Sequence, residues 1–232
     1  TKDGKLLTTL GTVGVPSDTG YDGSNLDTVV RPGGPFNTCT NLAIAPSGEL
    51  YVSDGYGNCQ VHRFTADGEL IQSWGTPGTG PGEFYLPHGV WVDDEGRVLI
   101  ADRENERIQV FSPDGEFMEE WTDVQRPCAL FIDPAGFVYV AELRNDAGWR
   151  SYTRGTIAEP RPGRVSVYDL KGTVQARWGG QEMAQQGNFV APHGISVDSK
   201  GNVYVAEVTH TMGGRSGLVP EGTHDIQKFT RV

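Results

Sequence analysis

Apolar and polar residues alternate with a period of two along most of the chain, which is the pattern of half-buried β-strands. The strand-length runs are separated by turn residues, and pairs such as Asp-Gly and Lys-Gly supply the positive φ that tight hairpins require. The same order of strands and turns recurs four times. We therefore predict four repeats, at about residues 39–75, 87–122, 127–180 and 192–232.

Each repeat predicts a four-stranded antiparallel blade, with strands a to d in chain order. The fourth repeat ends after strand c. The segment TKDGKLLTTLG, residues 1–11, aligns with TADGELIQSWG, residues 65–75, which is strand d of the first repeat. We therefore predict that residues 1–11 supply the last strand of the fourth blade and close a ring. The predicted fold is an all-β propeller that forms a single domain over residues 1–232.

Three longer insertions, rich in Gly, Pro, Ser and Arg, interrupt the repeats at residues 12–38, 143–163 and 209–224. The first precedes a strand a, and the other two lie between strands b and c. In an antiparallel blade these two kinds of connection emerge on the same face. We therefore expect function to be carried by loops on that face.

The composition narrows the function classes. With 19 Lys and Arg against 30 Asp and Glu, the net charge of −11 is scattered and offers no basic face for a nucleic acid. No apolar run is long enough to span a membrane, so we predict a soluble protein without a membrane partner. The chain begins with Thr, which indicates that the natural N-terminus is missing. The compartment therefore stays open, with a secreted or periplasmic location among the alternatives.

Three cysteines, Cys39, Cys59 and Cys128, are too few for a disulfide-stapled miniprotein or a Cys-rich zinc module. Cys39 begins one strand and Cys59 follows the hairpin partner of that strand. A Cys39–Cys59 bridge is therefore geometrically plausible, and the alternative is two free thiols.

Pro-His pairs open strand a in two repeats, at His88 and His193. Tyr56 and Arg103 follow strand b, which returns to the same face, so we expect the four side chains to converge at the mouth of the central channel. Neutral imidazole suits zinc, copper, iron or nickel, and a catalytic zinc usually takes three protein ligands. The two histidines therefore predict a metal site whose third ligand is not identified. The alternative is that Pro-His-Gly only sets the geometry at the start of the strand.

The remaining candidates have structural alternatives. His210 and His224 lie in the last insertion, where either could supply the third ligand, although a role at the rim of the loop is the preferred interpretation; His62 on strand c is interpreted as structural. An acidic residue recurs after strand b, and its recurrence favours a role in a turn or a backbone hydrogen bond over a role in catalysis. A tryptophan recurs near the end of strand d, and its recurrence favours packing between blades. These residues are Asp54, Asp102, Glu142 and Glu207, and Trp74, Trp121 and Trp178.

The stretches YVSDGYGN, LPHGVWV…ADRENERIQVF and APHGI…YVAE resemble the NHL-repeat propellers and, more narrowly, the catalytic core of peptidyl-α-hydroxyglycine α-amidating lyase. The resemblance covers most of the chain and implies a six-bladed propeller that binds zinc through three histidines in Pro-His motifs. His88 and His193 match the second and third of them. Tyr56 matches the active-site tyrosine, proposed as a base, and Arg103 matches an active-site arginine. The implied reaction cleaves the C–N bond of a carbinolamide and releases an amide and glyoxylate.

The chain departs from this family in two respects. Only four blades are present, so the first Pro-His motif of the family and an additional early arginine are expected upstream of Thr1, unless the chain is a genuine four-bladed ring. Gly194 stands where the family has an Asp that ligates a structural calcium, which puts that calcium in doubt. Two function classes follow: a zinc-dependent lyase for a small carboxylated or peptide-derived substrate, or a non-catalytic scaffold that binds a protein or sugar ligand.

Overall fold

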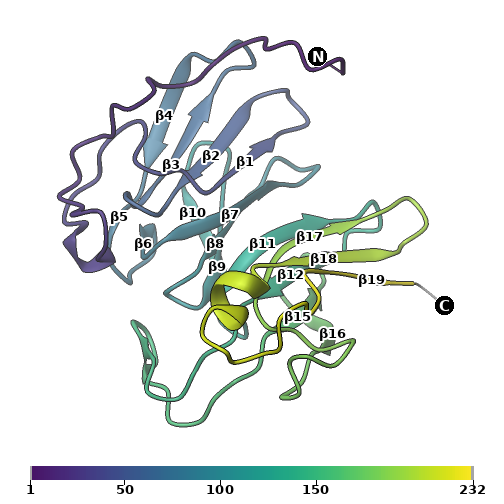
Figure 1. Ribbon diagram of the computed structural model, residues 1–232. Coiled ribbons are helices and arrows are strands. Elements are labelled where there is room, and N and C mark those ends of the chain that lie inside the picture. Colours follow the sequence, from purple (N-terminus) through teal and green to yellow (C-terminus); the bar gives the residue numbers. More distant parts are fainter. Residues whose placement is uncertain (1, 231–232) are drawn as a thin grey trace. The chain divides into compact units, whose positions relative to one another are not determined.

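The computed structural model describes residues 2–230, and β-strands account for nearly all of its regular secondary structure (Figure 1). The strands form four propeller-type blades, which confirms the predicted fold class. By their contacts the residues divide into two compact units, one up to Ile100 and again over Gln109–Glu119, the other over Ala101–Ile108 and from Glu120 onward. The single domain over residues 1–232 stays a prediction.

The first blade is an antiparallel sheet whose strands follow the chain order. A short parallel pair and one 3₁₀ turn lie in the connections on either side of it. The blade consists of β1 (Asn41–Ile44), β2 (Leu50–Asp54), β3 (Gln60–Phe64) and β4 (Leu70–Trp74); the additional elements are η1 (Leu26–Thr28), β5 (Thr76–Pro77) and β6 (Glu83–Phe84).

The second and third blades have the same order, and the third carries a small extra hairpin within its long insertion. The second consists of β7 (Pro87–Val92), β8 (Val98–Asp102), β9 (Arg107–Phe111) and β10 (Phe117–Trp121). The third consists of β11 (Pro127–Ile132), β12 (Val138–Glu142), β15 (Arg164–Tyr168) and β16 (Val174–Trp178), with β13 (Arg150–Ser151) and β14 (Gly155–Thr156) between β12 and β15.

The fourth blade has three strands in the order β17-β18-β19. A short π-helix, η2, lies in the insertion between the second and third strands of this blade. The bounds are β17 (Pro192–Val197), β18 (Val203–Glu207), η2 (His210–Gly214) and β19 (Ile226–Phe229).

In the second, third and fourth blades, the tight turn between the first two strands contains an aspartate and a glycine. In the fourth blade, Asp198 Oδ1 accepts hydrogen bonds from the backbone N–H groups of Lys200 and Asn202, both 2.9 Å. Gly201 has a φ of 80°, a conformation that glycine adopts without steric cost. The side chain and the glycine together close the turn, as the turn residues of the sequence predict.

The recurring tryptophans pack one blade against the next. Their rings lie 5.4 to 5.9 Å from an aromatic ring of the following blade, a distance typical of favourable aromatic pairs. The predicted packing role is therefore confirmed for the pairs Trp74–Phe111, Trp121–Tyr168 and Trp178–Phe229.

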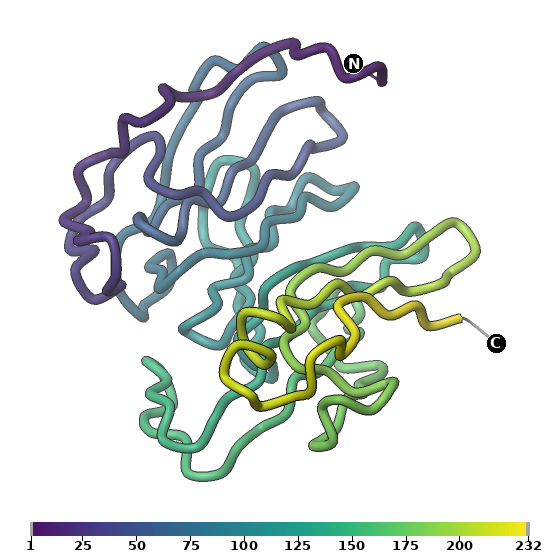
Figure 2. Tube along the Cα trace, in the orientation of Figure 1, coloured from purple at the N-terminus to yellow at the C-terminus, as the bar shows by residue number. Residues whose placement is uncertain are grey.

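The predicted role of residues 1–11 is wrong for the described part of that segment. Residues 2–11 form no strand, and no strand from them joins the β17-β18-β19 sheet. Figure 2 shows this segment in purple, and a Cβ on Gly68, in the turn from β3 to β4, would lie 2.8 Å from Leu10. Alignment identifies a strand-like sequence but not the sheet edge that accepts it, and closing a ring between distant segments carries an entropy cost.

The Cys39–Cys59 bridge is not formed. Cys39 is a free, exposed cysteine and Cys59 is a free, buried one. The burial of Cys59 at 1% exposure places it in the apolar core of the first blade, where it packs as a small hydrophobic residue. Within residues 2–230, no helix has the length and apolar character needed to cross a membrane.

Candidate metal centre

One position at the start of strand a carries the candidate ligands. His88, Cys128 and His193 are each the second residue of an inner strand, after Pro87, Pro127 and Pro192. The first blade has Thr40 at this position. Sequence reasoning found the two histidines and missed Cys128, although Pro127-Cys128 stands in the same frame as the two Pro-His pairs and could have revealed it.

The backbone before this position is unusual in three blades. Thr38, Leu86 and Arg126 have φ values of 62°, 64° and 35°, a region that residues other than glycine seldom adopt. Each lies two residues before the ligand position. Such conformations persist where the surrounding structure enforces them, and they are frequent at functional sites. The sharp turn directs the following residue into the first position of strand a.

The recurring carboxylates after strand b hold this turn in place. Glu142 accepts a hydrogen bond of 2.6 Å from the backbone N–H of Gln125, and Glu207 accepts one of 2.7 Å from that of Val190. Asp54 accepts equivalent bonds from Asn37. Burial raises the pKa of both Glu142 and Glu207. These bonds support the structural interpretation of the acidic positions, because each carboxylate anchors the segment that leads into strand a.

In the first unit, Tyr56 and His88 lie next to each other. The Tyr56 hydroxyl is 3.1 Å from Nε2 of His88, and the two rings meet edge to face with centroids 5.5 Å apart. Ser53 donates a 2.9 Å hydrogen bond to the backbone oxygen of His88. His88 is 3% exposed, so its ring is held in a fixed position beside the tyrosine hydroxyl.

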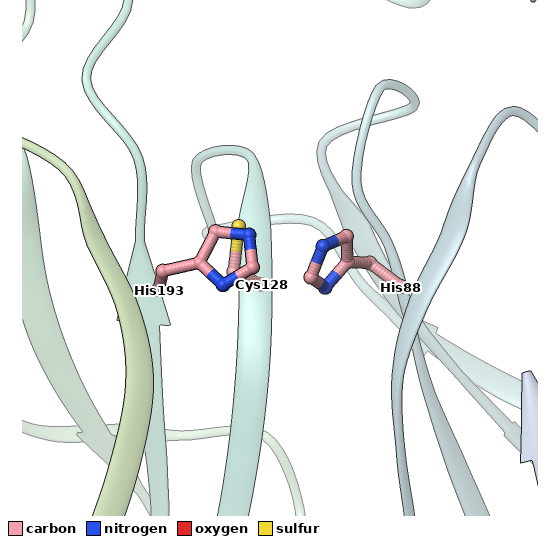
Figure 3. A group of neighbouring side chains, drawn as sticks. All are labelled: His88, Cys128 and His193. Carbon is pink, nitrogen blue, oxygen red and sulfur yellow. The ribbon is translucent and has the colours of Figure 1, made fainter. Parts of the chain in front are cut away.

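In the second unit, Cys128 and His193 present donor atoms within 4.8 Å of one another. Cys128 is fully buried and His193 is partly exposed. Their strands, β11 and β17, contact each other directly. Figure 3 draws these two side chains and that of His88; each of the three side chains can offer one ligand atom to a metal ion.

Burial, together with the charge of Arg103, determines the protonation states of Cys128 and His193. Burial lowers the pKa of His193, and the charge of Arg103 lowers it further, so the ring is neutral near pH 7. Burial raises the pKa of the Cys128 thiol to about 11, an effect that Arg103 and Arg126 oppose. Without a metal the sulfur therefore keeps its proton, and binding of a metal would displace that proton.

A buried ion network fixes Arg103. Its Nε donates a 2.8 Å hydrogen bond to Oε1 of Glu104, and Arg126 donates to the same carboxylate at 2.9 and 3.2 Å. Glu104 is 4% exposed. Burial alone would raise the pKa of Glu104, but the two guanidinium groups hold it below its ordinary value. The two guanidinium groups thus share one buried carboxylate, which fixes the position of Arg103.

The other histidines are placed apart from these donors. His62 is fully buried, 2.7 Å from the Ser73 hydroxyl and 3.3 Å from Asp54, which supports its structural interpretation. His210 is exposed at the start of η2, and His224 lies 3.2 Å from the backbone oxygen of Asn188. Among residues 2–230, neither belongs to a group of three potential metal ligands.

The donor chemistry fits zinc. Two imidazoles and one thiolate are ligands that zinc accepts, and three protein ligands leave one tetrahedral position for water or substrate. The neutral state of His193 suits metal binding, since a ligating nitrogen must carry no proton. The resemblance implies three histidines, the first of them upstream of Thr1, so Cys128 is a candidate ligand that the resemblance does not supply.

The chain is similar in sequence to several named proteins. The NHL repeat family matches residues 84–111. NHL repeat-containing protein 3 from Homo sapiens is 33% identical over 181 residues, which are 75% of this chain and 48% of that protein. Peptidyl-glycine alpha-amidating monooxygenase from Mus musculus is 41% identical over 182 residues, 74% of this chain and 17% of that protein. Peptidyl-alpha-hydroxyglycine alpha-amidating lyase 1 from Drosophila melanogaster is 28% identical over 195 residues, 77% of this chain and 35% of that protein.

The matched region is thus less than half the length of these relatives. A solved structure of a catalytically inactive virginiamycin B lyase from Staphylococcus aureus superimposes with a TM-score of 0.54 at 12% identity, over 85% of this chain and 57% of that one. At this identity the likeness concerns the fold alone. The repeat match and the named relatives agree with the residues described above: residues 84–111 match the NHL repeat, and the chain is a β-propeller that resembles the peptidyl-α-hydroxyglycine α-amidating lyases.

Proposed function

We propose that the protein is a zinc-dependent lyase that cleaves the C–N bond of an N-acyl-α-hydroxyglycine and releases an amide and glyoxylate. The observation that carries the proposal is the repeated ligand position, where three blades place His, Cys and His directly after a proline. The similarity to amidating lyases supports the reaction class. The proposed ligands are His88, Cys128 and His193.

Zinc, when bound, would supply Lewis acidity at the substrate hydroxyl. Tyr56 is proposed to accept the hydroxyl proton, since its own hydroxyl lies 3.1 Å from the ring of the proposed ligand His88. As the C–N bond breaks, its electron pair stays on nitrogen, which takes up a proton and becomes the amide. The α-carbon becomes the aldehyde carbon of glyoxylate, so atoms and charge balance.

Arg103 is proposed to bind the substrate carboxylate. Its guanidinium and that of Arg126 share the carboxylate of Glu104, and charge-assisted hydrogen bonds from a guanidinium to a carboxylate are strong. Glu104 holds this guanidinium in place, so little ordering is required when the substrate binds.

The test is an assay of glyoxylate release from an N-acyl-α-hydroxyglycine. We expect turnover by the native protein, loss after removal of metal by a chelator, and recovery with zinc. Tyr56→Phe and Arg103→Ala should each reduce kcat/KM by about 100-fold or more, in the range found for general-base and charge-stabilising groups. His210→Ala, which removes an exposed histidine, is the matched control and should have no effect. Absence of glyoxylate from the zinc-loaded protein would refute the lyase and favour a binding scaffold.

A further inference from the structure

The insertion between β12 and β15 forms a β-hairpin arm, residues 145–161. Asn145 pairs with Arg161 at its base, and β13 pairs with β14 farther along. Backbone hydrogen bonds from Gly148 to the oxygen of Ile157, and from Ile157 to the oxygen of Trp149, join the two strands between these points. The arm therefore has a defined backbone over most of its length.

A single buried carboxylate anchors this hairpin arm. Glu106, 2% exposed, accepts hydrogen bonds from Asn145 Nδ2 at 2.6 Å and Ser151 Oγ at 2.7 Å. Arg161 and Arg154 also lie within 2.5 and 3.2 Å of it. Glu106 has a φ of 53°, so its backbone too is held in an uncommon conformation. Bonds from four positions along the arm fix the arm as a rigid part of the second unit.

The arm places Trp149 over Arg126. The Arg126 guanidinium lies 4.3 Å from the centroid of the Trp149 ring, a cation–π contact. Arg126 is 5% exposed, comes two residues before Cys128, and shares Glu104 with Arg103. Trp149 thus contacts Arg126, Arg126 contacts Glu104, and Glu104 contacts Arg103, whose guanidinium is proposed to bind the substrate carboxylate.

Trp149 is nevertheless 41% exposed. A large aromatic side chain on a rigid hairpin loses little conformational entropy on binding and offers apolar area to a ligand. The remaining surface of the indole suits an apolar group that extends from a substrate whose carboxylate is bound at Arg103.

We propose that Trp149 is a specificity-determining residue that binds the apolar acyl group next to the α-hydroxyglycine, with a preference for an aromatic ring. The proposal rests on the proposed function for the identity of the acyl substrate. It assigns the hairpin arm as the wall of the acyl subsite and predicts discrimination between substrates that differ only in that group.

The experiment compares binding of N-benzoylglycine and N-acetylglycine, two stable carboxylates without the reactive hydroxyl, by calorimetry with the zinc-loaded protein. We expect the native protein to bind the benzoyl compound about tenfold more tightly. Trp149→Ala should remove this difference and leave the affinity for the acetyl compound within about twofold, whereas Trp149→Phe should keep most of it. Phe137→Ala, at a 36% exposed phenylalanine beyond the other end of β11, is the control and should change neither affinity.

The outcomes separate this proposal from the lyase. Equal weakening of both ligands in Trp149→Ala, no change in either, or no binding of either to the native protein would overturn the acyl subsite. If the binding preference depends on Trp149 but no glyoxylate is released from α-hydroxy compounds, the subsite stands and the lyase fails. If glyoxylate is released and Trp149→Ala leaves the ratio of kcat/KM values for benzoyl and acetyl substrates unchanged, the lyase stands and the subsite fails.

Discussion

At the scale of single residues, the sequence repeat predicts which positions carry candidate ligands but not the protonation states of those ligands. The Pro-His frame predicted two ligand candidates, and the same frame contains Cys128, which an argument restricted to histidine passed over. Burial is the main cause of the protonation state of His193 and of Cys128. It keeps His193 neutral and Cys128 protonated, and neither effect is visible in the sequence because it depends on the neighbouring strands and on Arg103.

The pH dependence of stability should contain a contribution from Asp198. Hydrogen bonds from the Asn202 side chain, and from backbone N–H groups of the turn, lower the pKa of Asp198 from 3.8 to about 2. A carboxyl group whose pKa is depressed in the folded state stabilises the protein above its unfolded pKa, and this contribution is lost as the pH falls through the folded pKa. The relevant window therefore runs from about pH 4 down to about pH 2.

Asp198→Asn keeps an oxygen acceptor in the turn and removes the titrating group. We expect the free energy of unfolding in urea to fall less between about pH 7 and about pH 3 in this variant than in the native protein. Glu221→Gln, which removes one charge from an exposed loop, is the control and should follow the native protein. An unchanged pH dependence in Asp198→Asn would contradict the assignment.

At the scale of the elements, the alternation of apolar and polar residues predicted the blades, and the glycines predicted their turns. The hairpin β13–β14 was not predicted, because its stability comes from Glu106 and Arg126, which lie far away in the sequence. Residues 2–11, the described part of the predicted N-terminal strand, form no strand, since a local pattern does not specify a distant partner. Elements held by their own repeat were predictable, and elements held by other repeats were not.

Gly172, in the turn between β15 and β16, allows the packing between neighbouring blades to be tested. Its φ is 76°, and a Cβ there would lie 2.4 Å from Cδ1 of the buried Trp121, in the preceding blade. We expect Gly172→Ala to lower the free energy of unfolding by about 2–4 kcal/mol, from an unfavourable φ and from overpacking. Urea denaturation measures this difference.

Gly187→Ala is the matched control for Gly172→Ala. Gly187 also has a positive φ, of 88°, but a Cβ there would meet nothing within 4 Å. Gly187→Ala should lower the free energy of unfolding by about 1 kcal/mol, the cost of the unfavourable φ alone. Equal destabilisation by the two substitutions would show that contact between the blades at Trp121 contributes little to stability.

At the scale of the whole molecule, each of the four blades has one equivalent position at the start of strand a. The residue at this position differs from blade to blade: Thr40, His88, Cys128 and His193. The tryptophan pairs and the anchored turns keep these positions equivalent while their side chains diverge. Sequence was therefore sufficient to predict the fold class and most of the candidate site. It was insufficient for the ion network of Arg103, Glu104 and Arg126, which depends on how neighbouring strands bring these charges together.

The most direct test of the account is the metal content of the purified, tag-free protein, measured by elemental analysis together with the intact mass. We predict about one zinc per chain in the native protein, with an affinity reduced by tenfold or more in Cys128→Ala and largely restored in Cys128→His, because imidazole can replace thiolate as a zinc ligand. Thr40→Ala, at the equivalent position of the first blade, should keep the metal. A native protein that binds no zinc after incubation with the ion, or a Cys128→Ala variant that binds it with native affinity, would contradict the proposed centre.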